Sequence, residues 1–202
     1  MPDARFAAVV LAAGASRRMG PGRNKLLLEF DGEPLVRRST RVAVDAGLRP
    51  VIVVLGFAAD QVRRALGSLQ CDVALNPRWD DGAMSASLHV GLRRVPRSST
   101  GAIVLLADMV RVTAEMVRAV RDSAAHDAAP IVASRYEGVI APPVRFHRSI
   151  FPELVAWTGE GFKSVVQRHG PAVRFIDWPA QALADVDSPG DLERQPGIIT
   201  DH

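Results

Sequence analysis

The first concentration of chemically active residues is the segment 11–25, which reads LAAGASRRMGPGRNK. It combines three glycines with four cations, namely Gly14, Gly20 and Gly22 with Arg17, Arg18, Arg23 and Lys25. Glycines let a backbone approach phosphate oxygens closely, while free N–H groups and cations neutralise phosphate charge. The segment matches neither the GxxxxGK[ST] loop nor the GxGxxG fingerprint. We therefore predict triphosphate binding here, the alternative being a solvated basic loop.

Two carboxylates are candidates for a metal site. Asp108 follows the apolar run 102–106, and no helix start follows it until Thr113. A carboxylate at the end of a buried strand can hold Mg²⁺, which in turn bridges phosphate oxygens. A turn or capping role is the alternative for Asp108. Asp187, within DVDSPGDL at 185–192, can either cap a helix or supply a second ligand from far along the chain.

The segment 76–87 reads NPRWDDGAMSAS and offers groups that suit a nucleobase. Hydroxyls of Ser85 and Ser87, with free N–H groups at the start of the next helix, can hydrogen-bond a pyrimidine edge. Asn76 or Gly82 can fix the base. The alternative is that one of the serines simply caps the helix. We expect Trp79 to pack against the protein rather than to stack on a ligand.

Short apolar runs alternate with amphipathic stretches along the chain, and this order predicts the elements that position these groups. Continuously apolar runs favour buried parallel strands, expected at 6–13, 51–55, 72–75, 102–106 and 130–134. Helical spacing predicts helices at 34–46, 58–69, 83–95 and 114–125, the last capped by Thr113. A hairpin-like segment at 144–146 and a strand near 173–176 follow. The β-α-β-α order predicts an α/β fold with a doubly wound, Rossmann-like, mostly parallel sheet, whose ligands bind beyond the carboxyl ends of the strands.

Composition excludes several classes of protein. The chain has 202 residues, 48% of them hydrophobic, which suits one domain over 1–194 with a flexible tail at 195–202. A single cysteine, Cys71, excludes a disulfide scaffold. No apolar stretch approaches the roughly 18 residues of a membrane span, and the N-terminus does not resemble a secretory signal, so we expect a cytoplasmic protein. The net charge of +3 is scattered without basic runs, so we expect no nucleic-acid partner.

The motif LAAG-x-S-x-R-M-G, followed by N-K-L-L-L, resembles the signature of the MobA-like nucleotidyltransferases. The similarity extends in order and spacing to NPRWDDGAMSASLHVGL at 76–92, VLLADM at 104–109 and DVDSPGDL at 185–192. Among these proteins it is most marked for the molybdenum cofactor cytidylyltransferases, because LAAG goes with cytidylyl transfer and LAGG with guanylyl transfer. The resemblance implies a sheet of the nucleotide-diphospho-sugar transferase type.

The resemblance also implies a reaction and a site. CMP would pass from CTP to the terminal phosphate of molybdopterin, with release of pyrophosphate and with Mg²⁺ as cofactor. Asp108 and Asp187 would hold the metal, with Asp108 counted among the catalytic residues alongside Arg18 and Lys25, which would contact the phosphates. The implied nucleotide-binding residues are Leu11, Ala12, Ala13, Gly14, Arg18, Lys25, Asn76, Gly82, Ser85 and Ser87. Partners would be these small molecules and a molybdoenzyme or its chaperone.

The acceptor half departs from the family pattern. Gly-x-x-Gly-(Asn/His)-Pro is replaced by GVIAPP at 138–143, and Gly-Asp-x-Gly-x-Arg by the shorter GEGFK at 159–163. Gly138, Pro143 and Lys163 are the predicted acceptor-binding residues, and Lys163 is a candidate replacement for the missing arginine. Two alternatives stay open. One is a sugar- or polyol-phosphate nucleotidyltransferase, and the other is a non-catalytic nucleotide-binding protein that delivers cofactor.

Overall fold

A seven-stranded sheet forms the centre of the computed structural model, which describes residues 5–20, 23–123, 129–158, 162–184 and 198–199. The strand order is β5-β4-β1-β6-β8-β7-β9. The bounds are β1 (Phe6–Ala12), β4 (Val51–Leu55), β5 (Asp72–Leu75), β6 (Gly101–Leu106), β7 (Ile131–Tyr136), β8 (Val139–His147) and β9 (Val173–Trp178). Only β8 runs antiparallel to its neighbours in this sheet. The predicted α/β, doubly wound, mostly parallel sheet is confirmed.

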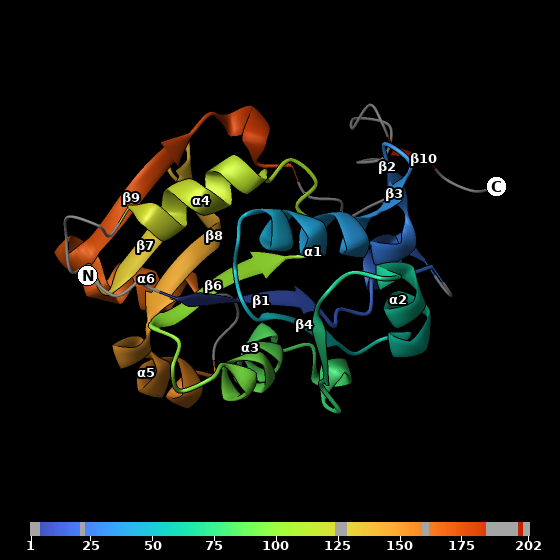
Figure 1. The fold of residues 1–202 in the computed structure, drawn as a ribbon, viewed down its shortest axis with the longest axis horizontal. Helices are drawn as coiled ribbons and strands as arrows, with labels where there is room; N and C mark the ends of the chain where they lie inside the picture. Colours follow the sequence, from blue (N-terminus) through green and yellow to red (C-terminus); the bar gives the residue numbers. More distant parts are fainter. Residues whose placement is uncertain (1–4, 21–22, 124–128, 159–161, 185–197, 200–202) are drawn as a thin grey trace.

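Both faces of the sheet are covered by helices, which explains why its central strands are apolar throughout (Figure 1). All seven residues of β1 and all five of β4 are buried. Alternate residues of β1 belong to different cores, with Ala8 and Val10 on one face and Ala7 and Val9 on the other. The continuous apolar runs in the sequence therefore reflect burial on both sides.

The helices divide between these two faces. α1 (Leu35–Asp45), α2 (Ala59–Leu66) and α4 (Ala114–Asp122) contribute to the core that contains Ala8 and Val10. α3 (Met84–Arg94), α5 (Phe151–Ala156) and α6 (Lys163–His169) contribute to the core on the opposite face. The Thr113 side chain accepts a hydrogen bond from the Met116 amide, so the predicted cap of α4 is confirmed.

A second, three-stranded sheet was not predicted. It consists of β2 (Glu29–Phe30), β3 (Glu33–Pro34) and β10 (Ile198–Ile199), in the order β10-β2-β3. Short 3-10 helices occur along the chain: η1 (Arg17–Met19), η2 (Lys25–Leu27), η3 (Trp79–Asp81), η4 (Arg148–Ile150), η5 (Gly170–Ala172) and η6 (Ala180–Ala182). Ile198 and Ile199 fall within the stretch 195–202, for which the sequence predicts a flexible tail, and they pair antiparallel with β2.

The antiparallel pair β7–β8 contains an irregularity at Pro142-Pro143. Ala133 pairs with Val144, but Ser134 already pairs with Ala141, so the two prolines lie outside the regular ladder. The Ser134 hydroxyl donates to the Pro143 carbonyl at 2.9 Å, and the buried Tyr136 hydroxyl donates to the Pro142 carbonyl at 2.7 Å. Burial also raises the pKa of Tyr136, which keeps its hydroxyl a donor. A long strand with a bulge thus replaces the short hairpin segment expected at 144–146.

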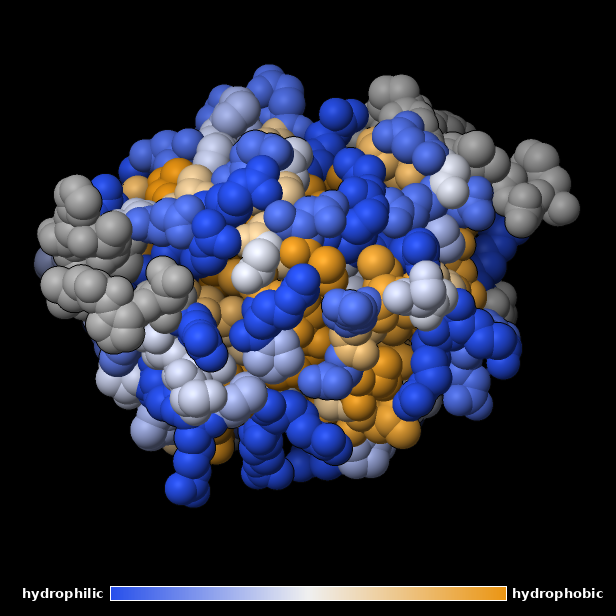
Figure 2. Space-filling model, viewed as in Figure 1, coloured by the Kyte–Doolittle hydropathy of each residue, from blue (hydrophilic) through white to orange (hydrophobic). Residues whose placement is uncertain are grey.

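The face of the molecule seen in Figure 2 is mostly polar. Figure 2 shows a largely hydrophilic face with hydrophobic residues gathered between α2 and α3 in this view. Among the described residues, the exposed large hydrophobic side chains are Leu75, Val139 and Val155. None of the described helices combines the length and apolar character needed to cross a bilayer.

Candidate active site

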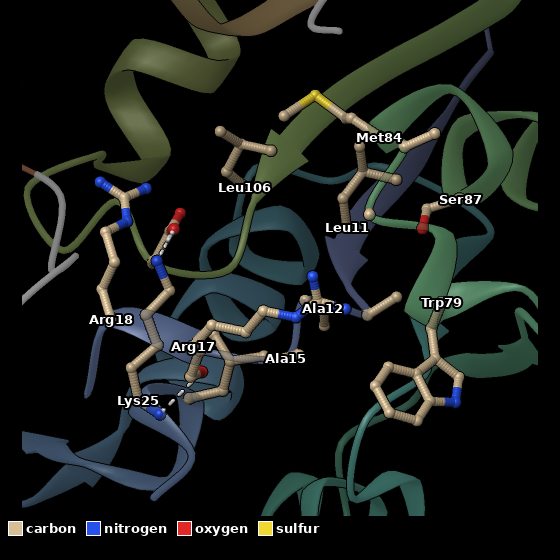
Figure 3. A pocket seen from close by; sticks show the side chains of 17 residues that line it. Leu11, Ala12, Ala15, Arg17, Arg18, Lys25, Trp79, Met84, Ser87 and Leu106 are labelled. Carbon is tan, nitrogen blue, oxygen red and sulfur yellow. Dashed lines mark hydrogen bonds and ion pairs between the residues drawn. The ribbon is translucent and has the colours of Figure 1, made fainter. Parts of the chain in front are cut away.

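A cavity of about 540 Å³ opens at the carboxyl ends of β1 and β6. This volume lies within the range usual for sites that take a small molecule. The lining residues include eight of those predicted to bind nucleotide, namely Leu11, Ala12, Ala13, Gly14, Arg18, Lys25, Gly82 and Ser87, together with Asp108. In Figure 3, Arg18 and Lys25 lie on one side of the cavity, and Met84, Ser87 and Trp79 lie on the other. The cavity therefore has a cationic side and a mostly apolar side.

The segment after β1 folds back on itself through two polar side chains. The Lys25 amide donates to Ser16 Oγ at 3.1 Å, and the Leu26 amide donates to Asn24 Oδ1 at 3.0 Å. Ser16 itself has φ 52°, a left-handed conformation that turns the chain into η1. Asn24 is buried and caps η2, the short helix that begins at Lys25. These bonds explain why the serine and asparagine of the motif are needed to place Lys25.

The Lys25 ammonium meets Asp108 across the floor of the cavity. Lys25 Nζ lies 2.6 Å from Asp108 Oδ2, and the two side chains are only 13% and 18% exposed. The other oxygen, Oδ1, is buried and has no hydrogen-bond partner among the residues that the structure describes. A buried carboxylate oxygen without a donor suits a hard cation such as Mg²⁺. Asp108 therefore fits the metal-binding role that the sequence predicts for it.

The loop that carries Asp108 is held by α1 and β1. The Ala107 amide donates to the Leu11 carbonyl at 3.1 Å. The buried Ser39 hydroxyl donates to the Ala107 carbonyl, and Arg38 Nε donates to the Val110 carbonyl, both at 2.9 Å. Sequence reasoning missed Ser39 and Arg38, because nothing in the local pattern of a helix tells which strand-end loop its polar side chains will reach.

The expected second ligand, Asp187, lies outside the described residues. Within the described ranges, no group of three or more His, Cys, Asp or Glu side chains is placed to share one ion. Among those residues Asp108 is thus the carboxylate that lines the cavity. The pairing of Asp108 with Asp187 stays a prediction.

The apolar wall depends on a glycine that sequence reasoning missed. A Cβ on Gly56 would lie 2.4 Å from Trp79 Cβ and 2.7 Å from the Ala13 carbonyl oxygen. The Trp79 ring also packs on Phe57, with ring centroids 5.4 Å apart. Trp79 therefore packs against the protein as expected, but it lines the cavity as well. The available signal was Gly56 itself, a glycine directly after the buried strand 51–55.

The polar residues of the 76–87 segment separate into two groups. Ser87 lines the cavity, whereas Asn76 and Ser85 are buried and are not among the lining residues. Asn76 Nδ2 donates to Ser87 Oγ at 3.0 Å, so Asn76 acts on the cavity wall through Ser87. Neither serine caps α3, whose N-cap is Ala83 without a side-chain bond. The alternative of a serine cap is therefore wrong.

The predicted acceptor residues lie elsewhere at the sheet. Gly138 occupies the turn between β7 and β8 with φ 91°, Pro143 belongs to the bulge in β8, and Lys163 begins α6. None of these three lines the cavity. The structure thus brings the nucleotide candidates together and leaves the acceptor candidates apart from them.

Comparison with known proteins places this architecture in a family. The model of the MobA-like NTP transferase domain matches residues 8–173. The crystal structure of Rv0371c from Mycobacterium tuberculosis H37Rv is 32% identical with a TM-score of 0.82, over 95% of this chain and 97% of that one. A complex of Rv0371c with manganese is 30% identical with a TM-score of 0.78, over 95% of this chain and 97% of that one.

Curated relatives match over shorter stretches. The bifunctional protein GlmU of Anaeromyxobacter dehalogenans (strain 2CP-C) is 33% identical over 59% of this chain and 25% of its own length. A probable molybdenum cofactor guanylyltransferase of Opitutus terrae is 34% identical over 51% of this chain and 61% of its own length. The match thus spans a quarter of GlmU and under two thirds of the guanylyltransferase. Because the domain model covers most of the sequence and Rv0371c matches nearly end to end, the chain belongs to the MobA-like NTP transferase family.

Proposed function

We propose that this protein is a metal-dependent nucleotidyltransferase that transfers CMP from CTP to the terminal phosphate of molybdopterin. The observation that carries the proposal is the Lys25–Asp108 pair, whose charged atoms lie 2.6 Å apart in the cavity that the 11–18 segment lines. The second carboxylate oxygen of Asp108 is buried and has no hydrogen-bond partner within the described part of the chain. This arrangement presents a cation and an anionic metal ligand to the same point, as a metal–triphosphate complex requires.

The chemistry requires little from the protein beyond position and charge. An oxygen of the acceptor's terminal phosphate attacks the α-phosphorus of CTP, and the bond from that phosphorus to the β-phosphate oxygen breaks, so pyrophosphate leaves. The attacking oxygen is already anionic, so no general base is needed. In-line alignment of the two substrates and neutralisation of the charge that develops in the transition state then account for the rate enhancement.

Each side of the cavity has a part in this scheme. Arg18 and Lys25 would hold the phosphates, with the backbone of Ala13 and Gly14 close to them. Asp108 would hold Mg²⁺ through the buried Oδ1, with Asp187 as the second ligand. Bound there, the metal would draw phosphate oxygens together and reduce their charge. The base would lie against the wall that contains Gly82 and Ser87, with Asn76 and Ser85 supporting this wall from behind.

The acceptor would approach from the β8 side. Val144 of β8 pairs with Val104 of β6, so Pro143 continues toward the end of β6 at which Leu106 lines the cavity. Gly138, Pro143 and Lys163 would bind the acceptor, and product would pass to a molybdoenzyme or its chaperone. The similarity to a probable molybdenum cofactor guanylyltransferase supports a pterin acceptor.

A sugar- or polyol-phosphate acceptor is the second candidate. It is favoured by the loss of a polar side chain in the 138–143 segment, where the resembled cytidylyltransferases carry Asn or His. A non-catalytic delivery protein is less well supported, because such a protein would not need a buried carboxylate oxygen reserved for a cation.

A pyrophosphate-release assay tests the proposal. Four nucleoside triphosphates would be combined with molybdopterin and with a panel of sugar phosphates, each with Mg²⁺. We expect release with CTP and molybdopterin, and its loss in Asp108→Asn. Release with a sugar phosphate alone would select the second candidate, release with another nucleotide would contradict cytidylyl transfer, and nucleotide binding without release from any pair would favour the delivery protein.

A further inference from the structure

An ion pair between Arg17, a cation of the predicted triphosphate segment with no individual role so far, and Asp80 joins the two walls of the cavity. Arg17 Nη2 lies 2.7 Å from Asp80 Oδ1 and 2.9 Å from the Asp80 carbonyl oxygen. The residues are 63 positions apart in sequence. Arg17 belongs to η1 in the phosphate-side segment, and Asp80 belongs to η3 in the opposite wall. The pair therefore connects two segments that the sheet brings to the same edge.

Folding stability does not account for this pair. The Arg17 and Asp80 side chains are 67% and 73% exposed, and ion pairs at such exposure are screened by water and contribute little to stability. Arg17 nevertheless lines the cavity, and Figure 3 shows its side chain directed toward Ala12 rather than away from the cavity. Its position is better explained by a ligand than by the fold.

Both ends of the bridge are anchored. η1 is closed by a bond from the Met19 amide to the Ser16 carbonyl at 2.8 Å, and the Met19 side chain is buried. η3 is anchored through Trp79, which packs on Phe57 and lies against Gly56. Because neither backbone is free to drift, the bridge fixes where the guanidinium lies.

The Arg17 guanidinium has further N–H donors besides those that bind Asp80. Both bonds to Asp80 come from Nη2, so Nε and Nη1 have no hydrogen-bond partner among the described residues. A guanidinium is a planar fork that can hold one acceptor while offering its other N–H groups to a second. The second acceptor must reach the cavity, and a phosphate of a nucleoside triphosphate is the acceptor that suits this fork.

The geometry points to Arg17 as a further nucleotide-binding residue, held across the cavity by Asp80 so that its remaining N–H groups bind a phosphate of the nucleoside triphosphate. Arg17 contacts the ligand, and Asp80 is a positioning residue that acts through Arg17. This inference rests on the proposed function and adds to it a link between the phosphate side and the base side of the cavity.

The test measures binding and turnover separately. With Mg²⁺ present, titration calorimetry would give the affinities for CTP and for inorganic tripolyphosphate, and the pyrophosphate assay would give KM and kcat. Loss of a charge-assisted hydrogen bond predicts affinities about tenfold weaker for both ligands in Arg17→Ala, with kcat nearly unchanged. Arg17→Lys should be intermediate, since an ammonium keeps the charge but lacks the fork.

Asp80 is tested by a matched pair of variants and a double-mutant cycle. Asp80→Asn should weaken binding of both ligands about threefold, whereas the control Asp81→Asn should not, because Asp81 pairs with Arg78 at 2.7 Å within the same wall. In the Arg17→Ala background the Asp80→Asn effect should vanish, which a merely structural role would not produce. Thermal unfolding of each variant should match the parent.

Three results would overturn the inference. Unchanged affinity in Arg17→Ala would remove Arg17 from the site, and tighter binding in Asp80→Asn would mean that Asp80 competes with the ligand for Arg17. Absence of nucleotide binding by the parent protein would overturn the proposed function together with the inference. The first two results, obtained with a parent protein that binds and turns over CTP, would overturn the inference alone.

Discussion

Polar side chains have different roles in the two halves of the large sheet, the first half being the part around β1, β4 and β6 and the second the part around β7 and β8. Around β1, β4 and β6, the strand-end segments leave Lys25, Asp108 and Arg17 directed into one cavity. Around β7 and β8, the hydroxyls of Ser134 and Tyr136 are used by the protein itself, on the carbonyls of Pro143 and Pro142. The first half thus directs charged side chains into a cavity, and the second uses its hydroxyls to hold its own backbone.

This difference follows from connectivity. Parallel strands are joined by helices, so each strand end opens into a segment free to bind a ligand beyond the sheet. β7 and β8 are antiparallel and joined by a tight turn, and Pro142 and Pro143 of β8 lack the N–H groups that a regular ladder would pair. We infer that nucleotide binding resides in the first half, and that acceptor choice depends on the side chains at the rim of the second.

Asp108→Asn gives the largest expected effect. Replacing the carboxylate by an amide keeps the volume but removes the charge that would hold a cation, so we expect kcat to fall about a thousandfold. The pyrophosphate assay measures the loss, and electron paramagnetic resonance with Mn²⁺ measures metal binding. Unimpaired Mn²⁺ binding in this variant would contradict the role of Asp108.

Lys25→Met separates phosphate binding from metal binding. We expect kcat/KM to fall about 10- to 100-fold, because a charge-assisted contact to the phosphates is lost. Mn²⁺ alone should bind severalfold more tightly, since the ammonium no longer occupies Asp108 Oδ2. Weaker Mn²⁺ binding in Lys25→Met would show that the lysine supports the metal rather than competing with it.

Gly56→Ala and Gly14→Ala form a matched pair within the first half. The new Cβ at Gly56 would meet Trp79 and Ala13, so we expect a stability loss of about 1–3 kcal/mol. At Gly14 no atom of the residues that the structure describes, its two chain neighbours aside, lies within 4 Å of the added Cβ, so stability should be unchanged while CTP affinity falls. Denaturant unfolding and calorimetry measure the two quantities, and equal stability losses would contradict the separation.

Lys163→Ala gives the smallest expected effect and tests the second half. We expect KM for the acceptor to rise severalfold with KM for CTP unchanged, because Lys163 begins α6 and does not line the nucleotide cavity. Steady-state kinetics with each substrate varied in turn would measure both constants. A change in KM for CTP alone would show that Lys163 acts in nucleotide binding and not in acceptor binding.

Local pattern was sufficient for the elements with the strongest burial. β4, with all five residues buried, has the predicted bounds, because a continuous apolar run of that length has few alternatives in a covered sheet. β5 also has the predicted bounds, although it is an edge strand in which only Ala74 is buried. The predicted helix 58–69 instead ends at Leu66, where Gly67 takes φ 59°. β8 is much longer than the expected 144–146, because residues 139–141, on the far side of the proline bulge, also pair with β7.

By itself, the sequence determined the mostly parallel sheet and placed Lys25 and Asp108 in segments that follow its strands, where the cavity opens. Only the tertiary structure decided that Arg17 bridges to Asp80, that Trp79 both packs and lines the cavity, and that Asn76 lies behind Ser87. Periodicity and turn residues are local, so a single chain segment carries them. A distance between residues 63 positions apart depends on how every intervening element packs.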